Sequence, residues 1–151
     1  MTADDSLLDL LPRLTQLSAA LTRGQLAQRA TDATGLNLDR PGISILVTLA
    51  NTGTPMRVGE IADRMQVAGP HITRQVQALE QRNLVQRVTD PNDKRVSLIE
   101  PTPAGAEAAK AYLTTVLGFF REVVAEWPAQ DQADLGRLLT KLAEDITTKL
   151  S

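Results

Sequence analysis

The stretch GPHITRQVQALEQRNLVQRVTDPNDKRVSLIE, residues 69–100, decides the fold. Its first half has apolar side chains at the three-and-four spacing of one helical face, namely Ile72, Val76 and Leu79. Gly69-Pro70 opens this helix, because the N–H that proline lacks would have no partner in a first helical turn. The pattern predicts a helix from Gly69 that buries these three side chains.

The second half of the stretch changes its period near Asn83. Residues 84–88 and 95–99 are two runs rich in β-branched side chains, and they flank the turn-forming sequence DPND at 90–93. A β-hairpin is therefore predicted directly after the helix.

Helices are also predicted before this stretch. A leucine pattern over residues 7–26 is amphipathic, and Pro12 within it predicts either a helix start or a kink. The sequence TGLN at 34–37 is a stop signal, and DRP at 39–41 begins a new helix with an acidic cap and a proline in its first turn. A short amphipathic helix is expected from about Val58 to Arg64.

The central order of helix, turn, helix and hairpin is that of a winged helix-turn-helix, over about residues 38–102. Two helices follow between residues 103 and 150, separated at Trp127-Pro128, and their apolar stripes exceed what the central lobe can bury. We therefore expect a homodimer through the terminal helices, about 5–34 and 103–150. The predicted fold class is mainly α with a small β-hairpin, in a single domain over residues 1–151.

The composition excludes several classes of protein. The chain has 151 residues, no cysteine and one histidine, which removes thiol catalysis, cysteine-based metal or redox sites and any site that needs two imidazoles. No stretch of about 18 apolar residues occurs, and the first residues are acidic where a signal peptide needs Lys or Arg. We expect a soluble cytoplasmic protein with no membrane partner, metal or cofactor.

Catalytic motifs are equally absent from the sequence. It contains no G-x-S-x-G, no Walker motif and no glycine-rich loop after a predicted strand, and no candidate nucleophile is paired with its single histidine. The chain is therefore not expected to be an enzyme.

The formal net charge of −2 hides an uneven distribution. Residues 57–95 hold seven basic and five acidic side chains, whereas the segments on either side are acidic. The middle third is thus the only basic part of the chain, although a surplus of two charges is small.

The outward face of the helix from Gly69 carries the chemistry of DNA recognition. The side chains on this face are Pro70, Arg74, Gln77, Ala78 and Gln81, with His71, Thr73 and Gln75 on its flanks. Arg can pair with guanine and Gln with adenine, while Thr and N–H groups hold phosphates, and the first carboxylate is Glu80. A solvated helix surface carries the same residue types, so this helix alone leaves both interpretations open.

The predicted hairpin adds a second basic element. Its tip carries Lys94 and Arg95, and a projecting loop of this kind can insert Arg into the minor groove of DNA. Asp93 would orient Arg95 or cap the turn, with a plain turn aspartate as the alternative. A charged hairpin tip by itself is also compatible with a solvated turn.

The central sequence resembles the MarR (multiple antibiotic resistance regulator) family of winged-helix regulators. The residues that carry the resemblance are LEQRNLV at 79–85, Arg87, DPNDKR at 90–95 and PAG at 103–105. Order and spacing agree over about residues 57–105, and the helical flanks match the dimer architecture of the family.

The resemblance implies a homodimeric repressor or activator, with a repressor expected, that binds a pseudo-palindromic operator in double-stranded DNA. The helix from Gly69 would lie in the major groove and Arg95 in the minor groove. It also implies a small lipophilic or phenolic effector between the dimerisation helices and the winged-helix lobe. That cleft is expected to be lined by apolar residues of 12–26, of 43–49 and of the start of the Pro103 helix.

The candidate DNA-binding residues lie before the short helix, on the helix from Gly69 and at the hairpin tip. They are Arg57, Gly69, Pro70, His71, Thr73, Arg74, Gln75, Gln77, Ala78, Asn92, Asp93, Lys94 and Arg95. A winged-helix dimer that binds another protein without binding DNA is the alternative, since the positive surplus of the central lobe is small.

The sequence departs from the family pattern at three places. Position 83 is often Gly in the family and is Asn here, which also tolerates a left-handed conformation. Position 92 is often Arg and is Asn here, so one wing cation is missing. The strand after the wing usually ends Leu-Thr, whereas Glu100-Pro101-Thr102 intervenes here. Without cysteine and with His71 alone, neither oxidant sensing through cysteine nor metal sensing is expected.

Overall fold

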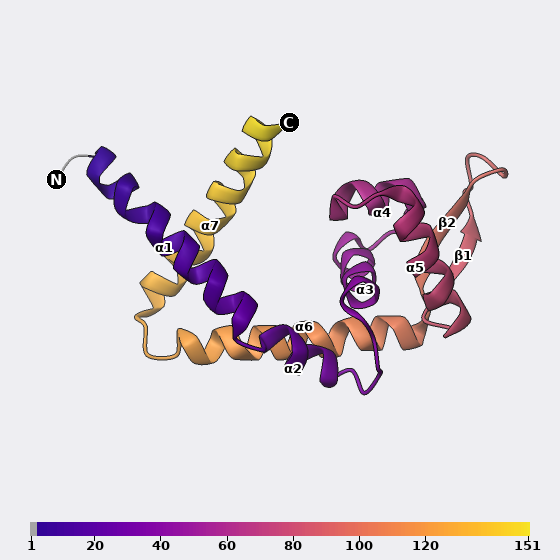
Figure 1. The fold of residues 1–151 in the computed structure, drawn as a ribbon, viewed down its shortest axis with the longest axis horizontal. Helices are drawn as coiled ribbons and strands as arrows, with labels where there is room; N and C mark the ends of the chain where they lie inside the picture. The colour runs from indigo at the N-terminus through magenta and orange to yellow at the C-terminus, as the bar shows by residue number, and fades with distance from the viewer. Residues whose placement is uncertain (1–2) are drawn as a thin grey trace. The chain divides into compact units, whose positions relative to one another are not determined.

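The computed structural model describes residues 3–151, which form seven helices and one antiparallel hairpin (Figure 1). The elements are α1 (Ala3–Arg23), α2 (Leu26–Asp32), α3 (Arg40–Thr52), α4 (Val58–Met65), α5 (Gly69–Gln81), β1 (Val85–Thr89), β2 (Ser97–Pro101), α6 (Pro103–Val123) and α7 (Ala129–Leu150). This is the mainly α class with a small β-hairpin that the sequence predicts. None of the described helices combines the length and the apolarity needed to cross a membrane.

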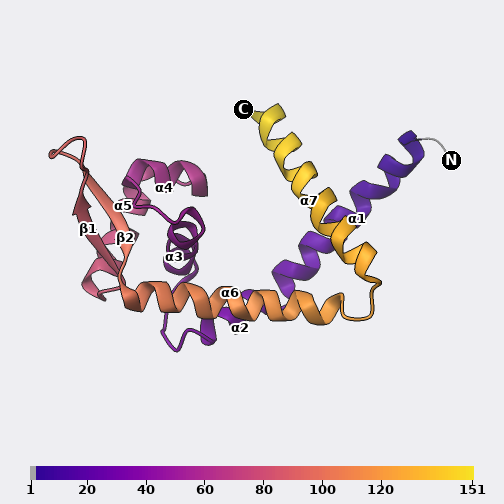
Figure 2. The same ribbon diagram turned by 180° about the vertical axis from the view of Figure 1, so that it is seen from behind.

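The chain divides into two compact units. The first ends at Val116 and the second is Leu117–Ser151. In the first unit, α3 lies between α4 and the first half of α6, and it also contacts α5 and β2 (Figures 1 and 2). The second unit holds the end of α6 and α7. The single-domain organisation stays a prediction.

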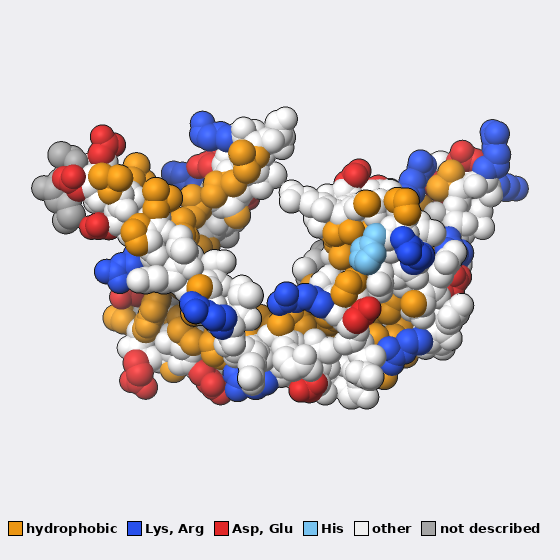
Figure 3. Space-filling model, viewed as in Figure 1, with side chains coloured by type: hydrophobic (Ala, Val, Ile, Leu, Met, Phe, Trp, Pro, Cys, Tyr) orange, Lys and Arg blue, Asp and Glu red, His pale blue; other side chains and the backbone are white. Residues whose placement is uncertain are grey.

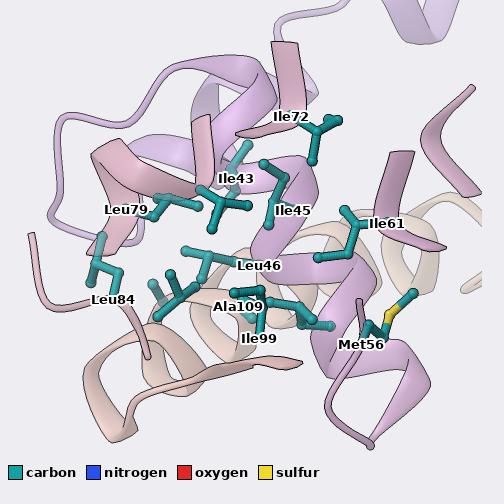
Figure 4. Packing of buried hydrophobic residues seen from close by; sticks show 14 of the residues in the cluster. Ile43, Ile45, Leu46, Met56, Ile61, Ile72, Leu79, Leu84, Ile99 and Ala109 are labelled. Carbon is teal, nitrogen blue, oxygen red and sulfur yellow. The ribbon is translucent and has the colours of Figure 1, made fainter. Parts of the chain in front are cut away.

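The core of the first unit is built around α3. Its buried apolar side chains are Ile43, Ile45, Leu46 and Leu49. The side chains that α5 adds are the three that its pattern predicts, Ile72, Val76 and Leu79. Figure 4 shows these helices meeting side chains from α4, from β2 and from α6. Burial of one Leu or Ile contributes about 1.5–3 kcal/mol, so this cluster determines which side of each surrounding helix faces outward.

Local signals place α3 along the chain. Asp39 Oδ1 accepts a hydrogen bond from the Gly42 N–H at 2.8 Å, and Pro41 lies in the first turn. Gly53 ends the helix with a φ of 73°, a left-handed conformation that glycine adopts without strain. The predicted acidic cap and proline start are confirmed.

The N-terminal segment forms two helices rather than one. α1 runs from Ala3 through Pro12, so the alternative of a helix start at Pro12 is wrong. It ends at Arg23 because Gln25 takes a left-handed conformation with a φ of 55°, after which α2 begins at Leu26. The leucine pattern does not reveal this break, but Gly24, directly after Arg23, is a residue type that often ends a helix.

The end of α5 decides where the hairpin begins. Asn83 has a φ of 57°, the left-handed conformation expected of it, and the Leu84 N–H donates to the Leu79 carbonyl oxygen at 2.9 Å. Leu84 therefore belongs to the helix terminus, and β1 starts at Val85 rather than at the predicted Leu84.

The second strand also starts later than predicted, at Ser97 instead of Arg95. The Val96 N–H donates to the Asp93 carbonyl oxygen at 3.0 Å, which keeps Arg95 and Val96 in the turn. The two strands then pair antiparallel over their full length.

Thr102 joins the hairpin to α6. Its hydroxyl donates to the Asn83 carbonyl oxygen at 2.7 Å and accepts from the Gly105 N–H at 3.1 Å. Its own N–H donates to the Leu84 carbonyl oxygen at 3.1 Å. Thr102 thus caps α6 and ties it to the end of α5, so the departure at residues 100–102 leaves a closed junction.

In the second unit, α6 ends at Val123, ahead of the boundary that the sequence marks at Trp127. The Gln132 side chain explains the turn that follows, because its Nε2 donates to the carbonyl oxygens of Val124 and Trp127 at 3.0 and 3.1 Å. α7 then continues to Leu150.

Gly105→Ala is expected to destabilise the first unit. A Cβ at Gly105 would collide with the Leu84 carbonyl oxygen, which Thr102 also holds, so the backbone would have to shift. We expect a loss of about 1–3 kcal/mol in the free energy of unfolding, measured by urea denaturation at fixed protein concentration. Gly59→Ala in α4 is the control: a Cβ there meets nothing within 4 Å, and alanine favours a helix. Equal losses for the two variants would contradict this account of the junction.

Candidate nucleic-acid interface

α4 and α5 are the two helices of a helix-turn-helix. The turn between them consists of residues 66–68, in which Gln66 has a left-handed φ of 55°. Ile61 of α4 and Ile72 of α5 are fully buried in the same core. Because the inner face of α5 is buried in this core, its opposite face points to solvent.

The exposed face of α5 is the one predicted from its helical pattern. The exposed residues are Gly69, Pro70, His71, Arg74, Gln77, Ala78 and Gln81, with Thr73 and Gln75 partly exposed. His71, the pale-blue side chain in Figure 3, lies on the surface. The first turn of α5 has no acidic residue, and Glu80 near its end pairs with Arg87 at 3.2 Å. A phosphate or a base edge can approach these first turns without meeting a carboxylate.

The N-terminus of α5 is open to an anion. Among the described residues no side chain caps it, and a Cβ added to Gly69 would meet nothing within 4 Å. The N–H groups and the positive end of the helix dipole favour a phosphate oxygen at such a position. The Thr73 hydroxyl donates to the Gly69 carbonyl oxygen at 3.1 Å, so it is engaged within the helix.

The wing, residues 90–96, presents its cations to solvent at the tip of the hairpin (Figure 3). The Arg95 side chain is 95% exposed, and Lys94 and Asn92 are exposed as well. Asp93 Oδ1 accepts the Arg95 N–H at 3.0 Å and lies 3.7 Å from Arg95 Nε. Asp93 therefore has the geometry of both predicted roles, shaping the turn and orienting Arg95. The ion pair is weak because water surrounds Arg95.

Arg57 lies at the base of the wing rather than at its tip. It is the residue before α4, and its Nη2 is 3.4 Å from Asp90 Oδ2. Asp90 is buried, and its Oδ1 accepts the Asn92 N–H at 2.9 Å. The sequence does not mark Asp90 as an ion-pair partner, because Arg57 is 33 residues away. The hydrogen bond to the Asn92 N–H is predictable from the sequence, because an aspartate that starts a turn often accepts from the backbone two residues later.

Two other arginines of the basic central segment are engaged inside the lobe. Arg82 Nη1 donates to the Asn37 carbonyl oxygen at 2.8 Å, which ties the end of α5 to the loop before α3. Arg87 ties β1 to α5 through Glu80. These cations support the geometry of the interface, whereas Arg74 faces outward from it.

The first unit also contains a cavity of about 450 Å³ between the end of α1, α2 and the start of α3. Its lining includes the basic residues Arg23 and Arg40, the apolar Leu38 and Ile43, and Tyr112 of α6. The three segments predicted to line a cleft all contribute. The expected apolar lining does not match this cavity, because polar residues of α1, α2 and α3 also line it. Within residues 3–151, no three His, Asp or Glu side chains are grouped as metal ligands.

The chain is similar to known transcriptional regulators. The sequence pattern of the MarR family matches residues 38–97. The uncharacterized HTH-type transcriptional regulator YxaD of Bacillus subtilis strain 168 is 32% identical over 127 residues. That match covers 84% of this chain and 87% of YxaD.

Solved structures share the fold. A MarR family protein from Bacillus stearothermophilus has a TM-score of 0.77 at 20% identity, over 97% of this chain and 99% of that one. S. aureus MepR bound to ethidium bromide has a TM-score of 0.63 at 19% identity, over 87% of this chain and 95% of that one. A mutant of MepR bound to an oligodeoxyribonucleotide has a TM-score of 0.59 at 19% identity, over 87% of this chain and 97% of that one.

These likenesses agree with the winged helix-turn-helix and with the family pattern that the sequence carries at its centre. MarR proteins are transcriptional regulators and not enzymes, so the prediction that this chain is not an enzyme is confirmed. A protein-interaction module without DNA binding finds no support in this membership. The chain belongs to the MarR family and is a helix-turn-helix transcriptional regulator that binds DNA.

Proposed function

We propose that the chain is a homodimeric repressor that reads a pseudo-palindromic operator with α5 and the wing. One observation carries the proposal: the carboxylate-free first turns of α5 and the exposed Arg95 belong to one compact unit. An α-helix fits the major groove, and an arginine on a projecting loop fits the narrow minor groove beside it. Two such lobes in a dimer would read half-sites about 34–36 Å apart.

The candidate residues have distinct roles in this proposal. Arg74 and Gln77 would read base edges, Arg through two hydrogen bonds to guanine and Gln through two to adenine. The N-terminus of α5 at Gly69 would hold a phosphate oxygen. Arg95 would enter the minor groove, and Lys94 would add a phosphate contact. The MepR mutant with a bound oligodeoxyribonucleotide supports this use of the shared fold.

The terminal helices support a homodimer. α1 exposes a series of leucines from Leu7 to Leu21, of which Leu8 is 68% exposed. α7 has no buried residue, although it carries an apolar stripe from Leu135 to Leu150. Figure 3 shows orange apolar side chains gathered along each of these helices. Such faces need a partner in water, and a second copy offers the same faces by symmetry.

The cavity supports a small-molecule effector. Tyr112 adds an aromatic residue to the lining, and the positive charges of Arg23 and Arg40 favour a negative group on the ligand. We infer that a phenolic or other aromatic molecule with an anionic group fits this lining. MepR, which shares the fold, binds ethidium bromide in its solved structure.

The loop before α3 offers a connection from the cavity to the recognition helix. Leu38 and Arg40 of this region line the cavity, and Asn37 accepts the hydrogen bond from Arg82 at the end of α5. A ligand that moves this loop would therefore also displace the end of α5. It would release DNA only by binding more tightly to a dimer whose recognition helices are wrongly separated for the operator.

Arg74→Ala and Arg95→Ala are expected to change DNA binding differently. In mobility-shift titrations, Arg74→Ala should cost about 1–3 kcal/mol on the DNA upstream of the coding sequence and much less on a random duplex, because it removes a base contact. Arg95→Ala should weaken binding to both duplexes. Lys110→Ala, at an exposed lysine of α6 outside both elements, is the control.

The same titrations across a salt series test the electrostatic part of the proposal. Affinity should fall steeply with salt, and Lys94→Ala should reduce the slope of log K against log salt by about 1. A folded dimer that shifts neither duplex at any salt concentration would overturn the proposal.

Leu138→Asp combined with Leu142→Asp is expected to convert the dimer to a monomer. The two carboxylates would sit in the apolar stripe of α7, where burial in an interface would cost several kcal/mol. Light scattering after size-exclusion chromatography measures the mass, and operator affinity should fall with it. Thr148→Asp adds a carboxylate to the opposite face of α7 and should leave the dimer intact. A dimer that survives the double substitution would place the interface elsewhere.

A thermal-shift screen of phenols and aromatic carboxylates is expected to find a stabilising compound. Saturation at 100 times Kd would stabilise the fold by about 2.7 kcal/mol, and the same compound should release DNA. Arg23→Gln with Arg40→Gln should abolish the shift in Tm while DNA binding persists. Unchanged stabilisation of this double variant would show that the compound binds outside the cavity.

A further inference from the structure

The base of the wing contains a carboxylate with two separate partners. Asp90 follows β1, and its side chain is only 12% exposed. Its Oδ1 accepts the Asn92 N–H at 2.9 Å, and its Oδ2 lies 3.4 Å from Arg57 Nη2. The Asp90 N–H also donates to the Val96 carbonyl oxygen at 3.0 Å, which closes the wing. Asp90 is therefore the point at which the wing loop and the start of α4 meet.

The backbone beside Arg57 is fixed independently of this ion pair. Met56 and Ile99 exchange both hydrogen bonds, at 2.9 and 2.7 Å, so the segment before α4 pairs with β2. The Arg57 N–H is also fixed by the first turn of α4, because it donates a hydrogen bond to Glu60 Oε1 at 3.3 Å. From this anchored backbone the side chain crosses to the end of the other strand. It thereby links α4, β2 and the wing in one place.

The two carboxylates of the wing differ in their surroundings. Asp93 faces an arginine that is 95% exposed, so water screens that pair. Asp90 is largely removed from water, and the loss of Arg57 would leave its charge with one backbone N–H as its partner. A buried carboxylate without a counter-ion is unfavourable, so the wing would shift to rehydrate it. The Arg57–Asp90 pair thus restrains the wing base.

We propose that Arg57 is a positioning residue that acts through Asp90 to set the wing relative to α5, and that it makes no DNA contact of its own. The inference rests on the proposed function of α5 and the wing. It assigns Arg57 a different role from the other candidates, because its guanidinium is directed to the wing base. The Arg57–Asp90 ion pair would then set how far Arg95 lies from the outward face of α5.

A double-mutant cycle tests this assignment. The variants are Arg57→Gln, Asp90→Asn and the two combined, titrated in mobility shifts against the DNA upstream of the coding sequence. Each single variant should lose about tenfold in affinity, the size of one groove contact. The double variant should lose no more than either single one, because both substitutions break the same link. Additive losses would overturn the proposal, and so would tighter binding by Asp90→Asn, which would mean that Asp90 holds back a DNA contact.

A background that lacks both wing cations, Lys94→Ala with Arg95→Ala, provides a second measurement that does not depend on the folding of Asp90→Asn. If Arg57 acts only through the wing, Arg57→Gln should change neither the affinity nor the salt slope of this background. A phosphate contact by Arg57 would instead reduce the slope by about 0.9. Lys110→Gln is the control for loss of a surface cation. If the unaltered chain binds no DNA, the proposed function fails together with this inference. If it binds DNA and Arg57→Gln weakens the wing variant as much as it weakens the unaltered chain, this inference alone fails.

Discussion

The burial of α3 is the interaction on which the rest of the structure depends. Ile45 and Leu46 are completely buried, and α4, α5, β2 and the start of α6 each supply apolar side chains to the same cluster. Exposing a Leu or Ile from this cluster would cost about 1.5–3 kcal/mol, so the surrounding elements have little freedom to rotate. Arg74 faces outward because Ile72 and Val76 face this core. The recognition surface is thus a consequence of packing on its opposite side.

Hydrogen bonds at the ends of helices and strands fix the positions that core packing leaves open. Thr102 binds the end of α5 to the start of α6, and Met56 pairs with Ile99 where the chain enters α4. These contacts satisfy backbone groups at helix and strand termini that packing alone would leave unpaired. The hairpin is consequently fixed at its base by hydrogen bonds, while its tip remains exposed. That contrast suits an element whose cations must reach a partner outside the molecule.

Much of the lobe could be predicted from the sequence. The buried face of α5, the cap of α3, the left-handed Asn83 and the hairpin all follow from local patterns, since each depends on residues close together in the chain. The strand starts were less accurate, because hydrogen bonds of the α5 terminus and the wing turn displace them. The break before α2 was missed because the leucine pattern runs through it, although Gly24 there is a typical helix-ending residue. The DNA-binding roles of the candidate residues stay predictions.

The sequence by itself determined the fold class, the outward face of α5 and the basic wing. Helical period, turn residues and capping residues act over a few positions, so one chain is enough to identify them. Only the tertiary structure decided that Arg57 meets Asp90, that Arg82 binds the loop before α3, and that two arginines line one cavity. Each of these contacts joins segments far apart along the chain. Side-chain periodicity carries no information about such distances, because they are set by how the helices pack.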